Sequence, residues 1–253
     1  MNSLFSQIKE RLQNRPVKVI GLGGIASPLC IYISQFYYCL NCNATIYLID
    51  GDEFELDNKE RMLFSEYGKK ALVKEAELKK HFGERVAFRA FPVYITTDNI
   101  QQMVTEGSLI FQCVDNHSTR KLVSAHCQKL EEVLLISGGN DGVDKNKSGT
   151  FGNVQIFERR AGKDLYNPLT RFHPEIARPA DHNPGDKKEE SCAVLVNKIP
   201  QLAFTNLAVA SAMLNAFYTW ALGKLNYEEV YLDILQAKMV PVARKLAQRS
   251  EKT

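Results

Sequence analysis

A glycine-rich turn between a hydrophobic run and a helix-length segment is the feature that most constrains this chain. The sequence VKVIGLGGIAS begins with mostly β-branched residues at 17–20 and continues through Gly21, Gly23 and Gly24. Such a turn from strand to helix lets backbone amides approach a phosphate group at the helix N-terminus. A second hydrophobic run, TIYLI, leads to Asp50, where a fold of this kind offers a carboxylate to ribose hydroxyls. Together the two features predict a nucleotide site in a Rossmann-like fold.

The fold class follows from the alternation of strand-like and helix-like patterns along the chain. This alternation is typical of an α/β fold with a mostly parallel sheet flanked by helices, and it places the ligand beyond the C-terminal ends of the strands. After residue 140 the pattern changes, and one more hydrophobic run predicts an antiparallel extension of the sheet. The strands are expected at 17–21, 45–50, 86–93, 109–115, 133–138 and 152–158.

Composition divides the chain into three parts. Residues 1–158, which start with a short amphipathic helix before Pro16, are expected to form the nucleotide-binding core. Residues 159–197 form a long stretch that is rich in proline and charge, and such a loop is usually functional or disordered. Residues 198–253 are expected to form C-terminal helices that complete the same domain.

Composition also excludes several classes of protein. The chain has 253 residues, 45% of them hydrophobic, and a net charge of +3, so it can bury a substantial core. It has no block of basic residues with interleaved aromatics, which argues against a nucleic-acid partner. The apolar run at 207–222 is interrupted by polar residues and is too short for a membrane span. Six scattered cysteines and the lack of an apolar signal core predict a cytoplasmic protein. Cys39 and Cys42 form a single CxxC pair, so no structural zinc is expected.

The glycine turn and Asp50 would look the same in a nicotinamide-dependent oxidoreductase. The residues that follow distinguish the two classes, because Asp52, Asn58, Arg61 and Lys74 gather polar and cationic groups where a triphosphate would lie. Phosphoryl chemistry depends on such groups to neutralise and align the phosphates. The pattern therefore favours ATP over NAD.

The segments DGDEFELDNKER at 50–61 and DNHSTR at 115–120 complete a longer pattern. With the glycine turn and a lysine after residue 61, they resemble the ThiF/MoeB/HesA superfamily, which includes the ubiquitin-activating enzymes. Four motifs occur in the same order over residues 17–140, although Ala26 stands where the family usually has a third glycine. The resemblance implies an adenylyltransferase that uses ATP and Mg²⁺, and a homodimer in which Arg11 or Arg15 reaches the partner's ATP site.

The resemblance also implies a role for individual residues. Asp50 would hold the ribose, and Asn58 and Arg61 would contact the phosphates. Lys74 would reach the same phosphates, with Lys70 as a competing candidate, and Asp115 would bind Mg²⁺ beside the reacting centre. The implied nucleotide-binding residues are Gly21, Gly23, Gly24, Asp50, Asp52, Asn58, Arg61 and Lys74, and the catalytic residues are Cys192, Arg61, Lys74 and Asp115.

The chemistry of a terminal carboxylate is consistent with these roles. A C-terminal carboxyl group has a pKa near ~3.5 and is ionised at neutral pH, so its attack on a phosphate needs no general base. Charge repulsion is the obstacle, which Arg61, Lys74 and Mg²⁺ would reduce. Cys192 follows a lysine-bearing stretch at an expected helix N-terminus, where a thiolate is stabilised.

The sequence thus predicts ATP-dependent adenylation of the C-terminal glycine of a ubiquitin-like protein. Thioester formation on Cys192 and transfer to a conjugating enzyme would follow. An adenylyltransferase for a sulfur-carrier protein, of ThiF or MoeB type, is the first alternative. A nicotinamide-dependent oxidoreductase and a non-catalytic partner subunit are the others.

Overall fold

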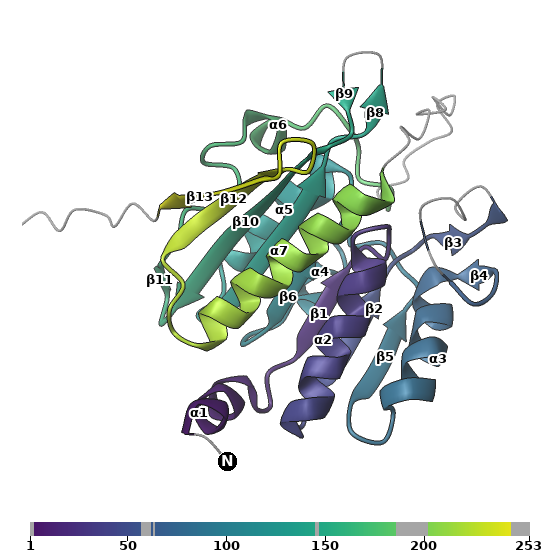
Figure 1. The fold of residues 1–253 in the computed structure, drawn as a ribbon, viewed down its shortest axis with the longest axis vertical. Coiled ribbons are helices and arrows are strands. Elements are labelled where there is room, and N and C mark those ends of the chain that lie inside the picture. Colours follow the sequence, from purple (N-terminus) through teal and green to yellow (C-terminus); the bar gives the residue numbers. More distant parts are fainter. Residues whose placement is uncertain (1–2, 57–61, 63, 145–146, 186–201, 244–253) are drawn as a thin grey trace, which may run out of the picture.

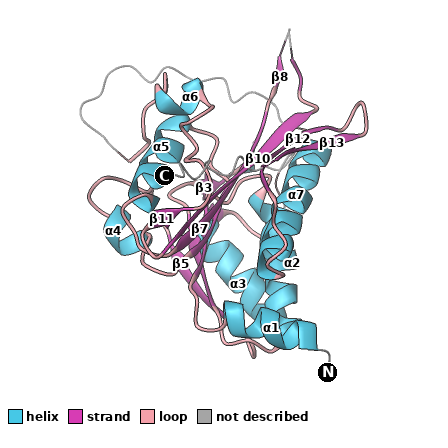
Figure 2. Cartoon of the chain, turned by 90° about the vertical axis from the view of Figure 1, so that its left-hand side faces the viewer, coloured by secondary structure: helices cyan, strands magenta, loops and turns pink. Residues whose placement is uncertain are grey.

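The computed structural model describes residues 3–56, 62, 64–144, 147–185 and 202–243. Within these residues a nine-stranded mixed sheet lies between two layers of helices (Figures 1 and 2). The strands follow the order β13-β12-β10-β7-β6-β1-β2-β5, with β11 paired to β10. The mostly parallel α/β class and its antiparallel extension are as the sequence predicts.

The parallel half of the sheet sets the position of the site. Ile20, the last residue of β1, pairs with Ile49 of β2 on one side and Gln112 of β6 on the other. These three strands therefore end at the same level, and the residues after them meet at one edge. The parallel strands are β1 (Val17–Ile20), β2 (Thr45–Ile49), β5 (Ala87–Phe91), β6 (Leu109–Gln112) and β7 (Val133–Asn140).

The antiparallel half is larger than the sequence predicts. The 198–253 segment was expected to be helical, but its described part contains one helix followed by two strands. Val230 and Leu232 are buried while Tyr231 between them is exposed, the period-two burial that a strand needs. The antiparallel strands are β10 (Phe151–Arg160), β11 (Lys163–Asp164), β12 (Tyr227–Asp233) and β13 (Lys238–Ala243).

Helices cover both faces of the sheet, each over its own hydrophobic cluster (Figure 2). One face carries α1 (Ser3–Leu12), α2 (Ala26–Leu40), α3 (Lys70–Phe82) and α7 (Ala203–Ala221). The other carries α4 (Ile100–Met103), α5 (His117–Cys127) and α6 (Pro174–Ala177). Two short hairpins project from the body, β3 (Glu53–Phe54) with β4 (Gly68–Lys69) and β8 (Val143–Asp144) with β9 (Lys147–Ser148). In the described chain, none of the helices combines the length and apolarity that a bilayer crossing requires.

Four of the five cysteines among the described residues act as small core residues. Cys30, Cys113 and Cys127 are buried, as is Cys42, while Cys39 is exposed at the end of α2. Burial raises the pKa of Cys30 to about 12, so this thiol stays protonated at neutral pH.

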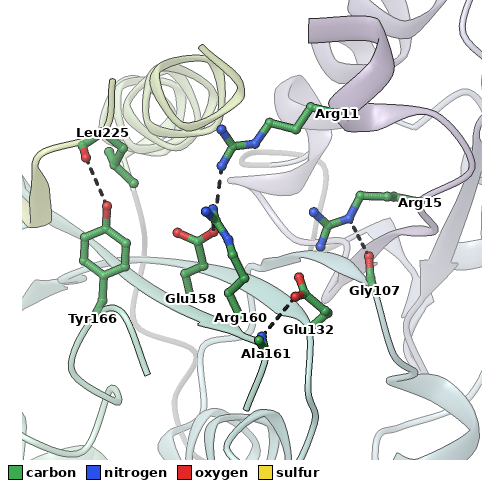
Figure 3. A network of polar contacts seen from close by, with 9 residues as sticks. All are labelled: Arg11, Arg15, Gly107, Glu132, Glu158, Arg160, Ala161, Tyr166 and Leu225. Carbon is green, nitrogen blue, oxygen red and sulfur yellow. Dashed lines mark hydrogen bonds and ion pairs between the residues drawn. The ribbon is translucent and has the colours of Figure 1, made fainter. Parts of the chain in front are cut away.

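Two arginines fasten α1 to the end of the sheet opposite the site (Figure 3). The guanidinium carbon of Arg11 lies 4.2 Å from the ring centroid of Trp220, and Arg11 pairs with Glu158 at 3.8 Å. Arg15 donates from Nε to the Gly107 carbonyl at 2.8 Å. Both guanidinium groups thus have partners within this chain, whereas the family resemblance implied that one of them reaches a partner subunit.

We expect Trp220→Ala to lower the free energy of unfolding by about 3–5 kcal/mol, because the substitution leaves a cavity under α7 and removes the ring beneath Arg11. Trp220 is fully buried, and its ring stacks on Phe217. Urea denaturation measures the change. Leu235→Ala is the matched control, because Leu235 is 74% exposed and its loss should cost less than about 0.5 kcal/mol. Equal effects of the two substitutions would contradict this role of Trp220.

Candidate functional site

The glycine turn lies where β1 ends, at the floor of a cavity of about 530 Å³. Gly21 has a φ of +84°, and a Cβ there would lie 2.8 Å from the Val114 side chain, so only glycine fits. Its amide donates to the Ile49 carbonyl at 2.9 Å and ties the turn to β2. Gly23 and Gly24 line the cavity beside it, as the sequence predicts for a phosphate-binding turn.

Asp50 connects this turn to the loop that follows β2. Its Oδ2 accepts from the Leu22 amide at 2.5 Å, and its Oδ1 accepts from the Asp52 amide at 2.7 Å. Burial raises the pKa of Asp50, while the Lys70 charge and the two amides act in the opposite direction. The carboxylate therefore has a fixed orientation in the cavity wall before any ligand arrives.

A cation and a phenol converge on Asp52 in the same wall. Lys70 Nζ donates to Asp52 Oδ2 at 2.8 Å, and the Tyr94 hydroxyl donates to Asp52 Oδ1 at 2.5 Å. Burial, followed by the hydrogen bond to Asp52, raises the pKa of Tyr94 and keeps the phenol protonated. Tyr94 is absent from the sequence prediction, because no local motif links a tyrosine after β5 to Asp52, which lies 42 residues earlier in the chain.

The structure brings Lys70 to the cavity, whereas the sequence favoured Lys74, with Lys70 as the competing candidate. Lys74 is one helical turn further along α3, and its Nζ pairs with Glu77 at 2.5 Å. The same ammonium lies 4.3 Å from the ring centroid of Phe64. Glu77 also accepts from the Ser65 amide. Lys74 thus contacts the 64–65 segment next to α3, and Lys70 lines the cavity at the N-terminus of the helix.

Asp115 lies at the far end of β6, exposed and lining the cavity as predicted. The next residue, Asn116, caps α5 by accepting from the Thr119 amide at 2.7 Å. Arg120 is buried and donates to the carbonyls of Val114 and Gly138, each at 2.8 Å. Burial lowers the pKa of Arg120. This guanidinium holds the turn that carries Asp115 against β7, a role inside the protein that the motif alone does not reveal.

The outer wall of the cavity comes from the long stretch that the sequence marked as a loop. Asp181 accepts from the His117 amide at 2.7 Å and the Ser118 amide at 2.8 Å, at the N-terminus of α5. Although burial opposes it, these hydrogen bonds lower the pKa of Asp181. His173, Glu175, Ile176 and Pro184 line the cavity from the same stretch, and Asn153 and Tyr231 of the antiparallel strands line it as well. Three predicted site residues, Asn58, Arg61 and Cys192, lie outside the described residues.

The chemistry of the cavity suits a phosphorylated ligand. Its volume falls within the range of small-molecule sites. A glycine turn that begins a helix and a nearby ammonium group both favour an anion. The described residues contain no group of three or more His, Cys, Asp or Glu side chains that could hold a metal ion.

Comparisons with known proteins agree with this geometry. A family profile described as "ThiF family" matches residues 2–252. The chain is 26% identical over 140 residues to adenylyltransferase and sulfurtransferase UBA4 from Candida albicans. It is 28% identical over 166 residues to ubiquitin-like modifier-activating enzyme 5 from Xenopus laevis. The two matches cover 54% and 59% of this chain, but only 30% and 38% of those proteins.

The fold is shared with a solved structure of E. coli MccB with ATP. The TM-score is 0.68 at 17% sequence identity, and the match covers 96% of this chain and 68% of that one. An identity this low shows the fold alone. The structural match confirms the α/β class with a mostly parallel sheet and an antiparallel extension.

Lys70→Ala should weaken ATP binding at least tenfold, because it removes the ammonium group that lines the cavity next to Asp52. Lys74→Ala should change ATP affinity less than threefold and should mainly lower thermal stability, because Lys74 contacts Glu77 and Phe64. Isothermal titration with ATP and thermal unfolding of both variants separate the two effects. A larger loss of ATP affinity in Lys74→Ala than in Lys70→Ala would indicate that Lys74, and not Lys70, binds the phosphates.

Proposed function

The chain belongs to the ThiF family, and from that premise we propose that it uses ATP to adenylate the C-terminal carboxylate of a protein. A carboxylate oxygen attacks the α-phosphorus, the bond between the α-phosphorus and the bridging oxygen breaks, and pyrophosphate leaves. No proton moves in this step, which accords with a site that needs cations and fixed geometry more than a general base. The observation that carries the proposal is the placement of the glycine turn, Asp50 and Lys70 around one cavity.

In this proposal the residues at the ends of β1 and β2 hold the nucleotide. Asp50 accepts the ribose hydroxyls, and the glycine turn directs its amides at the phosphates. Lys70 takes the phosphate role that the sequence analysis gave to Lys74, since its ammonium group lines the cavity. Asn58 and Arg61 keep their proposed phosphate contacts.

Mg²⁺ fits the remaining chemistry of the cavity. This ion is commonly held by one or two carboxylates together with substrate phosphates and water. Asp115 supplies an exposed carboxylate at the end of β6. Bound there, Mg²⁺ would neutralise phosphate charge during the transfer.

For the acceptor we propose the C-terminal glycine of a ubiquitin-like protein, followed by transfer to Cys192 and then to a conjugating enzyme. Gly185, the last described residue before Cys192, packs against Thr96 and Tyr94 at the cavity. The described chain before Cys192 therefore ends close to the cavity, which supports this proposal. The alternative is a sulfur-carrier protein, since one relative is named for both adenylyl and sulfur transfer. Family membership disfavours the nicotinamide-dependent reading.

ATP–pyrophosphate exchange in the presence of candidate carrier proteins tests the proposal. The wild-type chain should catalyse exchange with its true carrier, and Asp115→Ala should lower the rate at least a hundredfold through lost charge stabilisation. Cys192→Ala should retain exchange, because adenylation uses no thiol, but it should lose the thiol-sensitive adduct with the carrier on a non-reducing gel.

The outcomes of these experiments distinguish the three functional hypotheses. Exchange without any covalent adduct favours the sulfur-carrier alternative. An adduct that persists in Cys192→Ala removes Cys192 from the mechanism and leaves adenylation intact. Tighter binding of NAD than of ATP in a calorimetric titration would overturn the adenylation proposal itself.

We also propose a homodimer through the outer faces of α2 and α7. Neither helix contains a charged residue, although both lie at the surface and contact each other. Exposed apolar side chains on neighbouring helices often mark an interface, and a face without charges meets its own copy without repulsion. Its exposed apolar residues are Ile31, Tyr32, Phe204, Leu207 and Tyr218.

Leu207→Asp should shift the protein from dimer to monomer, because a two-fold interface would bring two buried carboxylates close together. Light scattering coupled to size-exclusion chromatography measures the mass. Leu235→Asp is the control, since Leu235 is exposed in the β12–β13 turn and should leave the mass unchanged. A wild-type monomer at micromolar concentration would contradict the dimer.

A further inference from the structure

Residues 173–185, here called the strap, form the outer wall of the cavity and are held at three points. Asp181 binds the first two amides of α5, and Asn183 Nδ2 donates to the Ile95 carbonyl at 2.8 Å. The third attachment is His173, at the beginning of the strap. Because His173, Glu175, Ile176 and Pro184 all line the cavity, the position of the strap determines the shape of that wall.

His173 lies between two carboxylates. Its Nδ1 is 2.8 Å from Glu175 Oε1, and its Nε2 is 2.8 Å from Glu229 Oε1. An ionised carboxylate only accepts hydrogen bonds, so both ring nitrogens must donate, and only the imidazolium form can do so. Although burial opposes the charge, the hydrogen bonds to Glu229 and Glu175 raise the pKa of His173.

The surroundings of His173 make this charge necessary. Glu229 belongs to β12 and is only 6% exposed, and it also receives a hydrogen bond from Asn153 at 3.5 Å. Without the imidazolium, Glu175 and Glu229 would face a neutral ring that can donate only one hydrogen bond. The other ionisable groups around this point are Tyr231 of β12, His117 and Arg120 of α5, and Asp181 of the strap.

We propose that His173 is a positioning residue, which as an imidazolium holds the beginning of the strap against β12 and so sets the outer wall of the cavity. The inference concerns the shape of the cavity and does not depend on which protein the chain adenylates. The nucleotide side, with Gly21 and Asp50, lies on other elements and stays in place when this attachment is lost.

The direction of the pH dependence follows from the raised pKa of His173. A histidine with a raised pKa in the folded state stabilises fully below its unfolded pKa of about 6.5 and loses that contribution as pH rises through the folded pKa. The attachment of Asp181 behaves differently, because its lowered pKa keeps the carboxylate ionised across this range. The beginning of the strap should therefore loosen at alkaline pH while its end remains bound.

Hydrogen exchange and NMR test the inference on the full chain without any assay of activity. The imidazole resonances of His173 should titrate above pH 6.5. The protection factors of the amides at 176–178, which bond to the carbonyls of His173 and Pro174, should fall roughly tenfold as His173 loses its proton, as expected for the loss of a charge-assisted hydrogen bond. His173→Gln should show the lower protection at every pH. His182→Gln is the matched control, because His182 is an exposed histidine of the same strap and should behave as wild type.

A second readout separates this role from a general structural one. If exchange activity is found, KM for the carrier should rise several-fold with pH in the wild type and not in His173→Gln, while the affinity for ATP stays constant in both. Glu229→Gln should lower the NMR pKa of His173. The inference fails if protection of the 176–178 amides is independent of pH in the wild type, or if His173→Gln and His182→Gln are indistinguishable. Neither failure would bear on adenylation.

Discussion

The register of the parallel strands is the constraint on which the site depends. Because Ile20 pairs with both Ile49 and Gln112, the residues after three strands emerge at one edge of the sheet. The Asp50 carboxylate then accepts a hydrogen bond from the Leu22 amide, which joins the ends of β1 and β2 into one wall of the cavity. A slip of one residue in β2 would point Asp50 at the other face, so the nucleotide site and the hydrophobic core are specified by the same pairing.

The charge of Lys70 is paired with Asp52 before a ligand enters the cavity. Lys70 is almost fully buried, and an unpaired ammonium group there would be costly. Asp52 offsets that cost, and Tyr94 holds the other oxygen of Asp52. A phosphate that approaches Lys70 therefore meets a cation whose position is already fixed. Preorganisation of this kind removes reorganisation from the reaction step, which is where electrostatic catalysis gains most.

Local sequence patterns predicted the parallel strands, the glycine turn, Asp50 and Asp115, because each depends on residues close together in the chain. These patterns did not predict features that depend on contacts between residues far apart in the sequence. Lys70 and Lys74 are both plausible by spacing, and only the start of α3 at residue 70 shows which one lines the cavity. Tyr227–Asp233 contains three acidic residues and was read as part of a helical segment, yet pairing with β10 makes it a strand. The contact of His173 with Glu229 joins residues 56 positions apart, which no motif encodes.

The long stretch after β10 differs from the rest of the chain in how it is held. Tyr166, Leu169 and Ile176 anchor it with apolar burial, and polar contacts of Asp181, Asn183 and His173 also hold the part that lines the cavity. Apolar burial hardly changes with pH, whereas a hydrogen bond to a titratable group does. A wall built in this way can respond to protons or to a charged ligand while the sheet beneath it stays rigid.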